Sequence, residues 1–145
     1  MKKVFLLILG LVSLAINAQA EVYEADASTI ESVTGSNYRY PVVIDFYATW
    51  CGPCQYYSPI VEETADKYSE KVIFLKVDID NNPSLCDQFN IQCVPTTIII
   101  YNKRNKHLRY EGTMEASELS DAINEALNKQ SGNQNNPINS VFNRR

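Results

Sequence analysis

Two buried strands joined by one helix constrain this fold more than any other feature of the chain. Residues 41–48 and 72–79 are short, mostly apolar runs rich in Val, Ile and Phe, which is typical of strands covered on both faces. Between them, apolar and small side chains recur at helical spacing: Ile60, Val61, Thr64, Ala65 and Tyr68. A strand, a helix and a second strand in this order predict parallel pairing with a right-handed crossover, and therefore an α/β fold.

The rest of the chain predicts further elements around this unit. We expect an antiparallel hairpin, one short edge strand and three helices. In chain order they are an edge strand over Val22–Glu24, a helix over Ser28–Val33, a short helix from Asn81 to near Asn90, the hairpin strands over Thr96–Tyr101 and His107–Glu111, and a helix over Met114–Lys129. Residues 21–129 then form one domain. Residues 130–145 are rich in Asn and Gln and poor in apolar side chains, so we expect a disordered polar tail.

The N-terminal residues 1–20 have the pattern of a secretory signal. Lys2 and Lys3 precede an apolar run, and small residues around Ala18 and Ala20 follow it. The apolar run is shorter than the roughly 20 residues that a membrane span needs. We therefore expect cleavage after Ala20 and a periplasmic or secreted protein.

The charge of the remaining chain argues against one class of partner. Loss of the two N-terminal lysines leaves 11 basic residues against 17 acidic ones, a net charge of −6. Nucleic-acid binding requires a basic surface, so we expect no nucleic-acid partner.

The segment Cys51-Gly52-Pro53-Cys54 lies where the first predicted strand ends and the helix begins. Unpaired backbone N–H groups and the positive end of the helix dipole favour a thiolate over a thiol at Cys51. Pro53 suits the first turn, where its missing N–H costs nothing. Two cysteines three positions apart on a helix start can form a disulfide that an external thiol can open.

Two structural roles for the pair are less consistent with the sequence. A zinc site needs two further ligands, and Cys86, Cys93 and His107 lack the compact spacing of such sites. A purely structural disulfide across so short a loop would constrain the unfolded chain very little. A redox-active pair that needs no metal or organic cofactor is therefore the preferred interpretation.

Several separated motifs together resemble the thioredoxin family. They are, in order, VVIDFYATWCGPC followed by SP, LKVDIDNNP, IQCVPT and YEGT, and the resemblance covers roughly residues 22–128. It implies a thioredoxin fold, with a central mixed five-stranded sheet flanked by about four helices. Tyr47, in place of a common tryptophan, and Gln55, in place of a frequent cation, depart from the family pattern.

The resemblance also implies roles for four residues. Cys51, on the exposed side of the helix start, would attack a substrate disulfide, and Cys54, one turn deeper, would resolve the mixed disulfide. Asp45 would be a buried proton acceptor for Cys54, and Lys76 on the neighbouring strand would pair with it. A buried carboxylate is costly without a partner, although Asp45 could also be a structural polar group with its hydrogen bonds satisfied.

A substrate-binding surface is implied beside the pair. In the family, the proline at the position of Pro95 is cis and faces the cysteines; without the resemblance, a proline that merely begins a strand would be the expectation. A shallow groove for an extended peptide would be lined by Trp50, Gly52, Pro53, Val94 and Gly112.

The other two cysteines have open alternatives. Cys86 and Cys93 could form a disulfide with each other, or remain free thiols, with intermolecular chemistry at Cys93.

The sequence therefore predicts an exported thiol–disulfide oxidoreductase, a monomer that acts on protein disulfides in the reducing direction. A redox partner, for which a membrane electron carrier is a candidate, would restore the pair. The alternatives are a net oxidant in oxidative protein folding and a thioredoxin-fold chaperone or interaction module.

Overall fold

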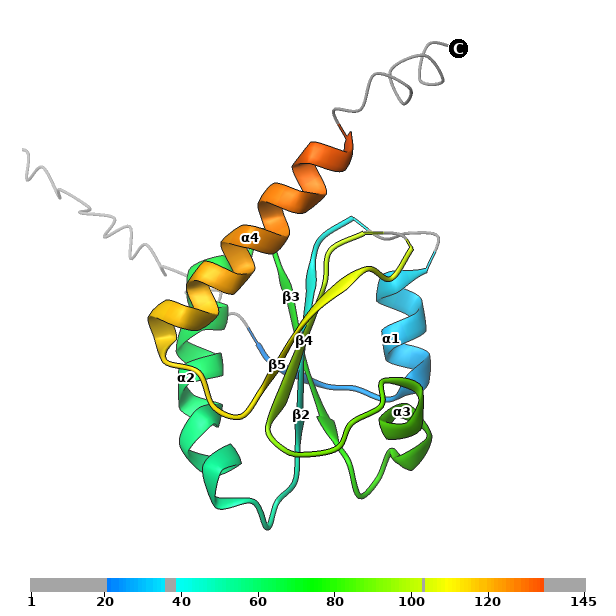
Figure 1. The fold of residues 1–145 in the computed structure, drawn as a ribbon, viewed down its shortest axis with the longest axis vertical. Coiled ribbons are helices and arrows are strands. Elements are labelled where there is room, and N and C mark those ends of the chain that lie inside the picture. Colours follow the sequence, from blue (N-terminus) through cyan, green and yellow to red (C-terminus); the bar gives the residue numbers. More distant parts are fainter. Residues whose placement is uncertain (1–20, 36–38, 103, 135–145) are drawn as a thin grey trace, which may run out of the picture.

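The computed structural model describes residues 21–35, 39–102 and 104–134, and these residues form an α/β domain (Figure 1). Its elements in chain order are β1 (Tyr23–Glu24), α1 (Ala27–Thr34), β2 (Val42–Tyr47), α2 (Gly52–Tyr68), β3 (Ile73–Asp78), α3 (Pro83–Gln88), β4 (Thr96–Ile100), β5 (His107–Glu111) and α4 (Ala116–Gln134).

The five strands form one mixed sheet in the order β1-β3-β2-β4-β5. The β2–α2–β3 unit pairs its strands in parallel, as the two apolar runs predict, and the observed register places Asp45 opposite Lys76. Strand β1 also pairs in parallel with β3, whereas β4 is antiparallel to both β2 and β5. The predicted five-stranded sheet with four helices is therefore confirmed.

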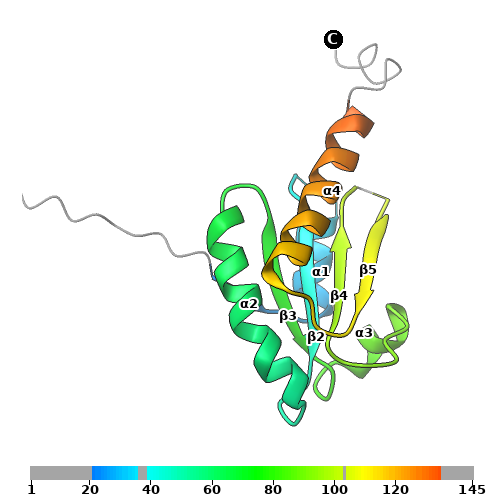
Figure 2. The ribbon, with the colours of Figure 1, turned by 60° about the vertical axis from the view of Figure 1, so that its left-hand side comes forward.

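Helices cover both faces of the sheet. The central strands therefore carry apolar side chains at most consecutive positions, because the side chains of both faces are buried. Figures 1 and 2 show α2 and α4 on one face and α1 and α3 on the other. On the first face, Val43 and Ile99 pack with α2 and α4. On the second, Ile44 and Ile98 pack with α1 and α3. Strand β2 is therefore buried between the two helix layers, and it leads through residues 48–50 into the cysteine segment.

The C-terminal helix differs from its predicted extent. Helix α4 continues to Gln134, so residues 130–134, predicted as the start of the disordered tail, are helical. Gln130 contributes a tertiary contact, because its side-chain amide donates to the carbonyl of Arg39 at 3.0 Å. Residues 135–145, and the predicted signal at residues 1–20, lie outside the described residues. Among the described residues, no helix is long and apolar enough to cross a membrane.

Candidate active site

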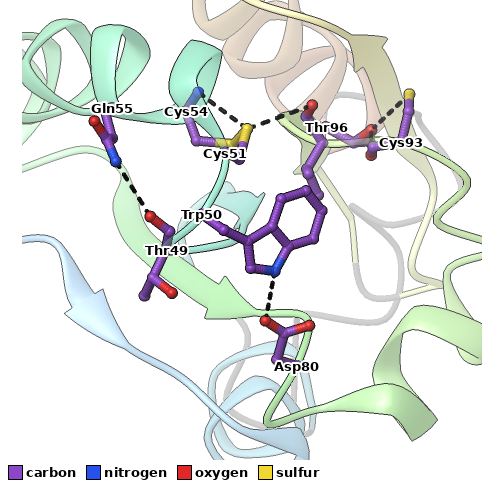
Figure 3. The surroundings of a disulfide bond; sticks show 9 residues. Thr49, Trp50, Cys51, Cys54, Gln55, Asp80, Cys93 and Thr96 are labelled. Carbon is purple, nitrogen blue, oxygen red and sulfur yellow. Dashed lines mark hydrogen bonds between the residues drawn. A yellow bond between two sulfur atoms is a disulfide. The ribbon is translucent and has the colours of Figure 1, made fainter.

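The cysteine pair is closed as a disulfide at the N-terminus of α2 (Figure 3). The Cα atoms of Cys51 and Cys54 are 5.3 Å apart. Cys51 is the N-cap of the helix, and its sulfur accepts a hydrogen bond from the backbone N–H of Cys54 at 3.2 Å. This contact places a helix N-terminal donor on the sulfur that would carry negative charge after reduction. Both cysteines are buried, 5% and 3% exposed, so Cys51 is hardly more accessible than Cys54 in the disulfide form.

The cysteine loop is held to the helix that it precedes. The Cys51 N–H donates to the carbonyl of Ala48 at 3.2 Å, and the side-chain amide of Gln55 donates to the carbonyl of Thr49 at 3.2 Å. Gln55 therefore braces the loop, although it supplies no positive charge to it. Gly52 and Pro53 are exposed at the start of α2, beside the disulfide.

The loop between α3 and β4 lies against the disulfide. The Val94–Pro95 peptide bond is cis, as the resemblance implies. The Val94 carbonyl oxygen lies 3.7 Å from the Cys51 sulfur, and Val94 packs against the cluster of Ala48 and the two cysteines. Gly112 is tied to the same loop, because its N–H donates to the Pro95 carbonyl at 2.8 Å. Its φ of +89° favours glycine at this position.

Trp50 is presented to solvent next to the pair. Its side chain is 67% exposed, and its indole Nε1 donates to Asp80 Oδ2 at 2.8 Å (Figure 3). Asp80 lies in the loop after β3, and its N–H donates to Oδ1 of Asp78, the last residue of that strand, at 3.0 Å. The indole is therefore both exposed and oriented. Sequence reasoning missed Asp80, because nothing in its local pattern indicates a partner 30 residues away.

Asp45 lies in β2 and is 5% exposed. Its Oδ1 atom is buried and has no hydrogen-bond partner among the described residues. Burial raises the pKa of the Asp45 carboxyl to about 7, and the positive charge of Lys76 opposes this effect only in part. The carboxyl can therefore change protonation state near neutral pH, which a proton acceptor requires.

The predicted pairing of Lys76 with Asp45 is wrong as a direct contact. Lys76 is opposite Asp45 in the sheet, but its Nζ lies 3.3 Å from Oε1 of Glu24. The reason is β1, which places Glu24 opposite Lys76 on the other side of β3. Glu24 is the more exposed carboxylate, so an ion pair with it desolvates the ammonium less than a contact with buried Asp45 would.

The remaining cysteines are free thiols, so the disulfide between them is not formed. Cys93 is exposed, whereas Cys86 is half-buried, and desolvation raises the pKa of its thiol. The described residues contain no group of three or more His, Cys, Asp or Glu arranged to hold a metal ion. The predicted site residues that the structure brings together are thus Cys51, Cys54, Val94, Pro95 and Gly112, with Trp50 alongside; the groove for a peptide stays a prediction.

Comparison with known proteins places this arrangement in one family. The thioredoxin family model matches residues 22–125. A chloroplastic thioredoxin Y of Oryza sativa subsp. japonica is 42% identical over 87 residues, which cover 60% of this chain and 51% of that relative. Thioredoxin C-3 of Corynebacterium nephridii is 37% identical over 98 residues, covering 68% and 66% of the two chains. The chain spans about half the length of the curated chloroplast thioredoxins Y that it matches.

Solved structures agree on the fold. A crystal structure of chloroplastic thioredoxin z superposes with a TM-score of 0.65 at 30% identity, covering 73% of this chain and 94% of that one. A Malassezia sympodialis thioredoxin gives a TM-score of 0.64 at 32% identity, with 74% and 91% coverage.

Proposed function

This chain belongs to the thioredoxin family, and we propose that it is an exported enzyme that reduces disulfides in protein substrates through Cys51 and Cys54. One observation carries the proposal. The two sulfurs are joined at a helix N-terminus, where the Cys54 N–H donates to the Cys51 sulfur, beside the cis Val94–Pro95 bond. A disulfide placed there can be opened and closed without rearrangement of the sheet.

In the first step, the Cys51 thiolate attacks one sulfur of a substrate disulfide. A mixed disulfide forms between Cys51 and the substrate, and the other substrate sulfur leaves as a thiolate. The Cys54 N–H supports the negative charge on Cys51 before the attack.

In the second step, the Cys54 thiolate attacks the Cys51 sulfur. The Cys51–Cys54 disulfide closes, the second substrate sulfur leaves, and the two electrons of the dithiol have passed to the substrate. Asp45 accepts the Cys54 proton in this step, a role that a carboxyl with a pKa of about 7 can perform at neutral pH. A redox partner that supplies a dithiol, such as a membrane electron carrier, then reopens the pair.

The reducing direction is supported by the surroundings of the pair. Gln55 is neutral and donates to a backbone carbonyl, and Lys76 is paired with Glu24, so neither supplies a cation to the Cys51 sulfur. A strong oxidant needs a highly stabilised thiolate. We expect a reduction potential nearer the roughly −270 mV typical of thioredoxin than the roughly −120 mV of a strong periplasmic oxidant; a potential above about −160 mV would favour the net oxidant.

Insulin reduction tests the chemistry, with C51S as the inactivating variant and C93S as its control. Both remove one thiol, but only Cys51 belongs to the disulfide. We expect C51S to lose turnover and C93S to keep it. Turnover that survives in C51S would refute the proposal, and a C51S protein that still prevents aggregation of an unfolded substrate, together with an inactive wild type, would identify a chaperone.

Export is supported by the Lys2-Lys3 start, the apolar run and the small residues before Glu21. Expression of the full chain and of a version without residues 2–20 tests it in a Gram-negative host. We expect the full chain in the periplasmic fraction with Glu21 as its N-terminus, and the shortened chain in the cytoplasm. A full-length protein retained in the cytoplasm would contradict export without affecting the redox chemistry.

A further inference from the structure

A row of polar side chains crosses the sheet at the level of Asp45. The pairing of the strands places Glu24 opposite Lys76, Lys76 opposite Asp45, and Asp45 opposite Thr97. Residues directly opposite one another in neighbouring strands point to the same face of the sheet. Asp45 therefore has a cation on one side and a hydroxyl on the other, and each could be its partner.

Both of these neighbours are bonded to other groups. The Lys76 ammonium lies 3.3 Å from Glu24 Oε1. On the other side, the Thr97 hydroxyl and the Tyr57 hydroxyl of α2 form a buried hydrogen bond of 3.0 Å. Asp45 Oδ1 remains without a hydrogen-bond partner among the described residues, although both of its neighbours in the row are polar.

Tyr47 holds the Glu24 carboxylate, which forms the ion pair with Lys76 in place of Asp45. Its hydroxyl donates to Glu24 Oε1 at 2.6 Å, the same oxygen that lies near the Lys76 ammonium. The ammonium also lies 5.8 Å from the centre of the Tyr47 ring, within the range of a cation–π contact. Tyr47 and Glu24 thus hold Lys76 from two directions.

We propose that Glu24 is a positioning residue which, together with Tyr47, holds the Lys76 ammonium on the β1 side of the sheet and leaves the Asp45 carboxyl without its cation. The use of this arrangement in catalysis rests on the proposed function. The positioning itself rests only on the contacts of Glu24, Tyr47 and Lys76.

The charges around Asp45 give the expected direction of the effect. Among the described residues, Lys76 from β3 is the charged group whose field lowers the pKa of Asp45; Tyr57 from α2 and Tyr47 from β2 are neutral at physiological pH, and the flanking Thr97 from β4 does not titrate. Without the Glu24 carboxylate, the carboxyl group that remains directly opposite Lys76 in the sheet is that of Asp45 on β2. A closer Lys76 favours the ionised form of Asp45, so the carboxyl would release its proton at lower pH.

The experiment compares E24Q with E63Q in the disulfide form of the protein. E63Q removes the same charge from an exposed ion pair with Lys67 on α2, so it controls for net charge. The probe is the side-chain carboxyl carbon of Asp45, followed by NMR from pH 4 to 9. We expect its midpoint to fall by about one pH unit in E24Q, to return toward the wild-type value in E24D, and to rise in K76M.

An Asp45 midpoint in E24Q that equals the wild-type or E63Q value, or that rises, would overturn the positioning role. The pH dependence of insulin reduction provides the second readout. A rate profile that moves to lower pH with the NMR midpoint supports both the positioning and the use of Asp45 as proton acceptor. If the NMR midpoint moves and the rate profile does not, Glu24 still positions Lys76, and it is the role of Asp45 in the proposed mechanism that fails.

Discussion

Replacement of Asp45 by Asn should change how the stability of the fold depends on pH. In the folded chain, burial raises the pKa of this carboxyl from 3.8 to about 7. Below pH 3.8 the group is protonated in both the folded and the unfolded state, so it has no effect on the pH dependence. Between pH 3.8 and about 7 the unfolded chain releases the proton and the folded chain keeps it. Stability should therefore fall as pH rises through this interval and then stay level.

The size of the effect follows from the interval. Each pH unit corresponds to about 1.4 kcal/mol for one proton, so an interval of roughly three units gives a loss of about 4 kcal/mol in the free energy of unfolding. The residue is 5% exposed, so solvent screening does little to reduce this figure. Asn keeps the shape of the side chain and removes the ionisation. Its amide still needs partners, which shifts the whole curve but not its slope.

Urea unfolding of the disulfide form at pH 4 and pH 8 measures the effect. We expect the wild type to lose about 4 kcal/mol over this range relative to D45N. D121N is the matched control, because it removes an exposed carboxylate of α4 and the same charge. If the free energy of unfolding changed equally between pH 4 and pH 8 in the wild type and in D45N, the Asp45 carboxyl would be well solvated or paired in the folded protein. The argument from its burial would then fail.

Three further outcomes are expected. C54S should accumulate substrates bound covalently to Cys51, since the resolving sulfur is absent, and these should disappear on denaturing gels after reduction; recovery of no such adducts would reverse the assigned order of attack. G112A should lower the free energy of unfolding by about 1 kcal/mol in urea titrations, because its φ of +89° is unfavourable for alanine, although a Cβ there would meet nothing within 4 Å; an unchanged midpoint would show that the loop relaxes freely. Iodoacetamide should modify Cys93 before Cys86 in the disulfide form, because Cys93 is exposed while desolvation raises the pKa of the Cys86 thiol; equal rates in peptide mass spectra would contradict this order.

The central sheet was predictable because its signals are local and repeated. The apolar runs that became β2 and β3 are long enough to show their pattern, and the helix between them requires a parallel crossover. The end of α4 was not predictable, since Gln130 is polar and its contact with Arg39 exists only in the folded chain. The Cys51–Cys54 disulfide was also predictable, because two cysteines three positions apart at a helix start can bring their sulfurs together.

The partners of the buried acid depended on tertiary structure. A strand of two residues is too short to show a period in sequence, yet β1 places Glu24 opposite Lys76, and the ammonium forms its ion pair with Glu24. The orientation of Trp50 also depends on tertiary structure, because its indole bonds to Asp80 in the loop after β3. Sequence alone thus determined the cysteine pair and the elements that carry it, because helix starts and buried strands are encoded over neighbouring positions. Tertiary structure decided which charged groups pair. The order of the strands determines which carboxylates lie near a cation, and the ion pair forms with the carboxylate whose desolvation costs least.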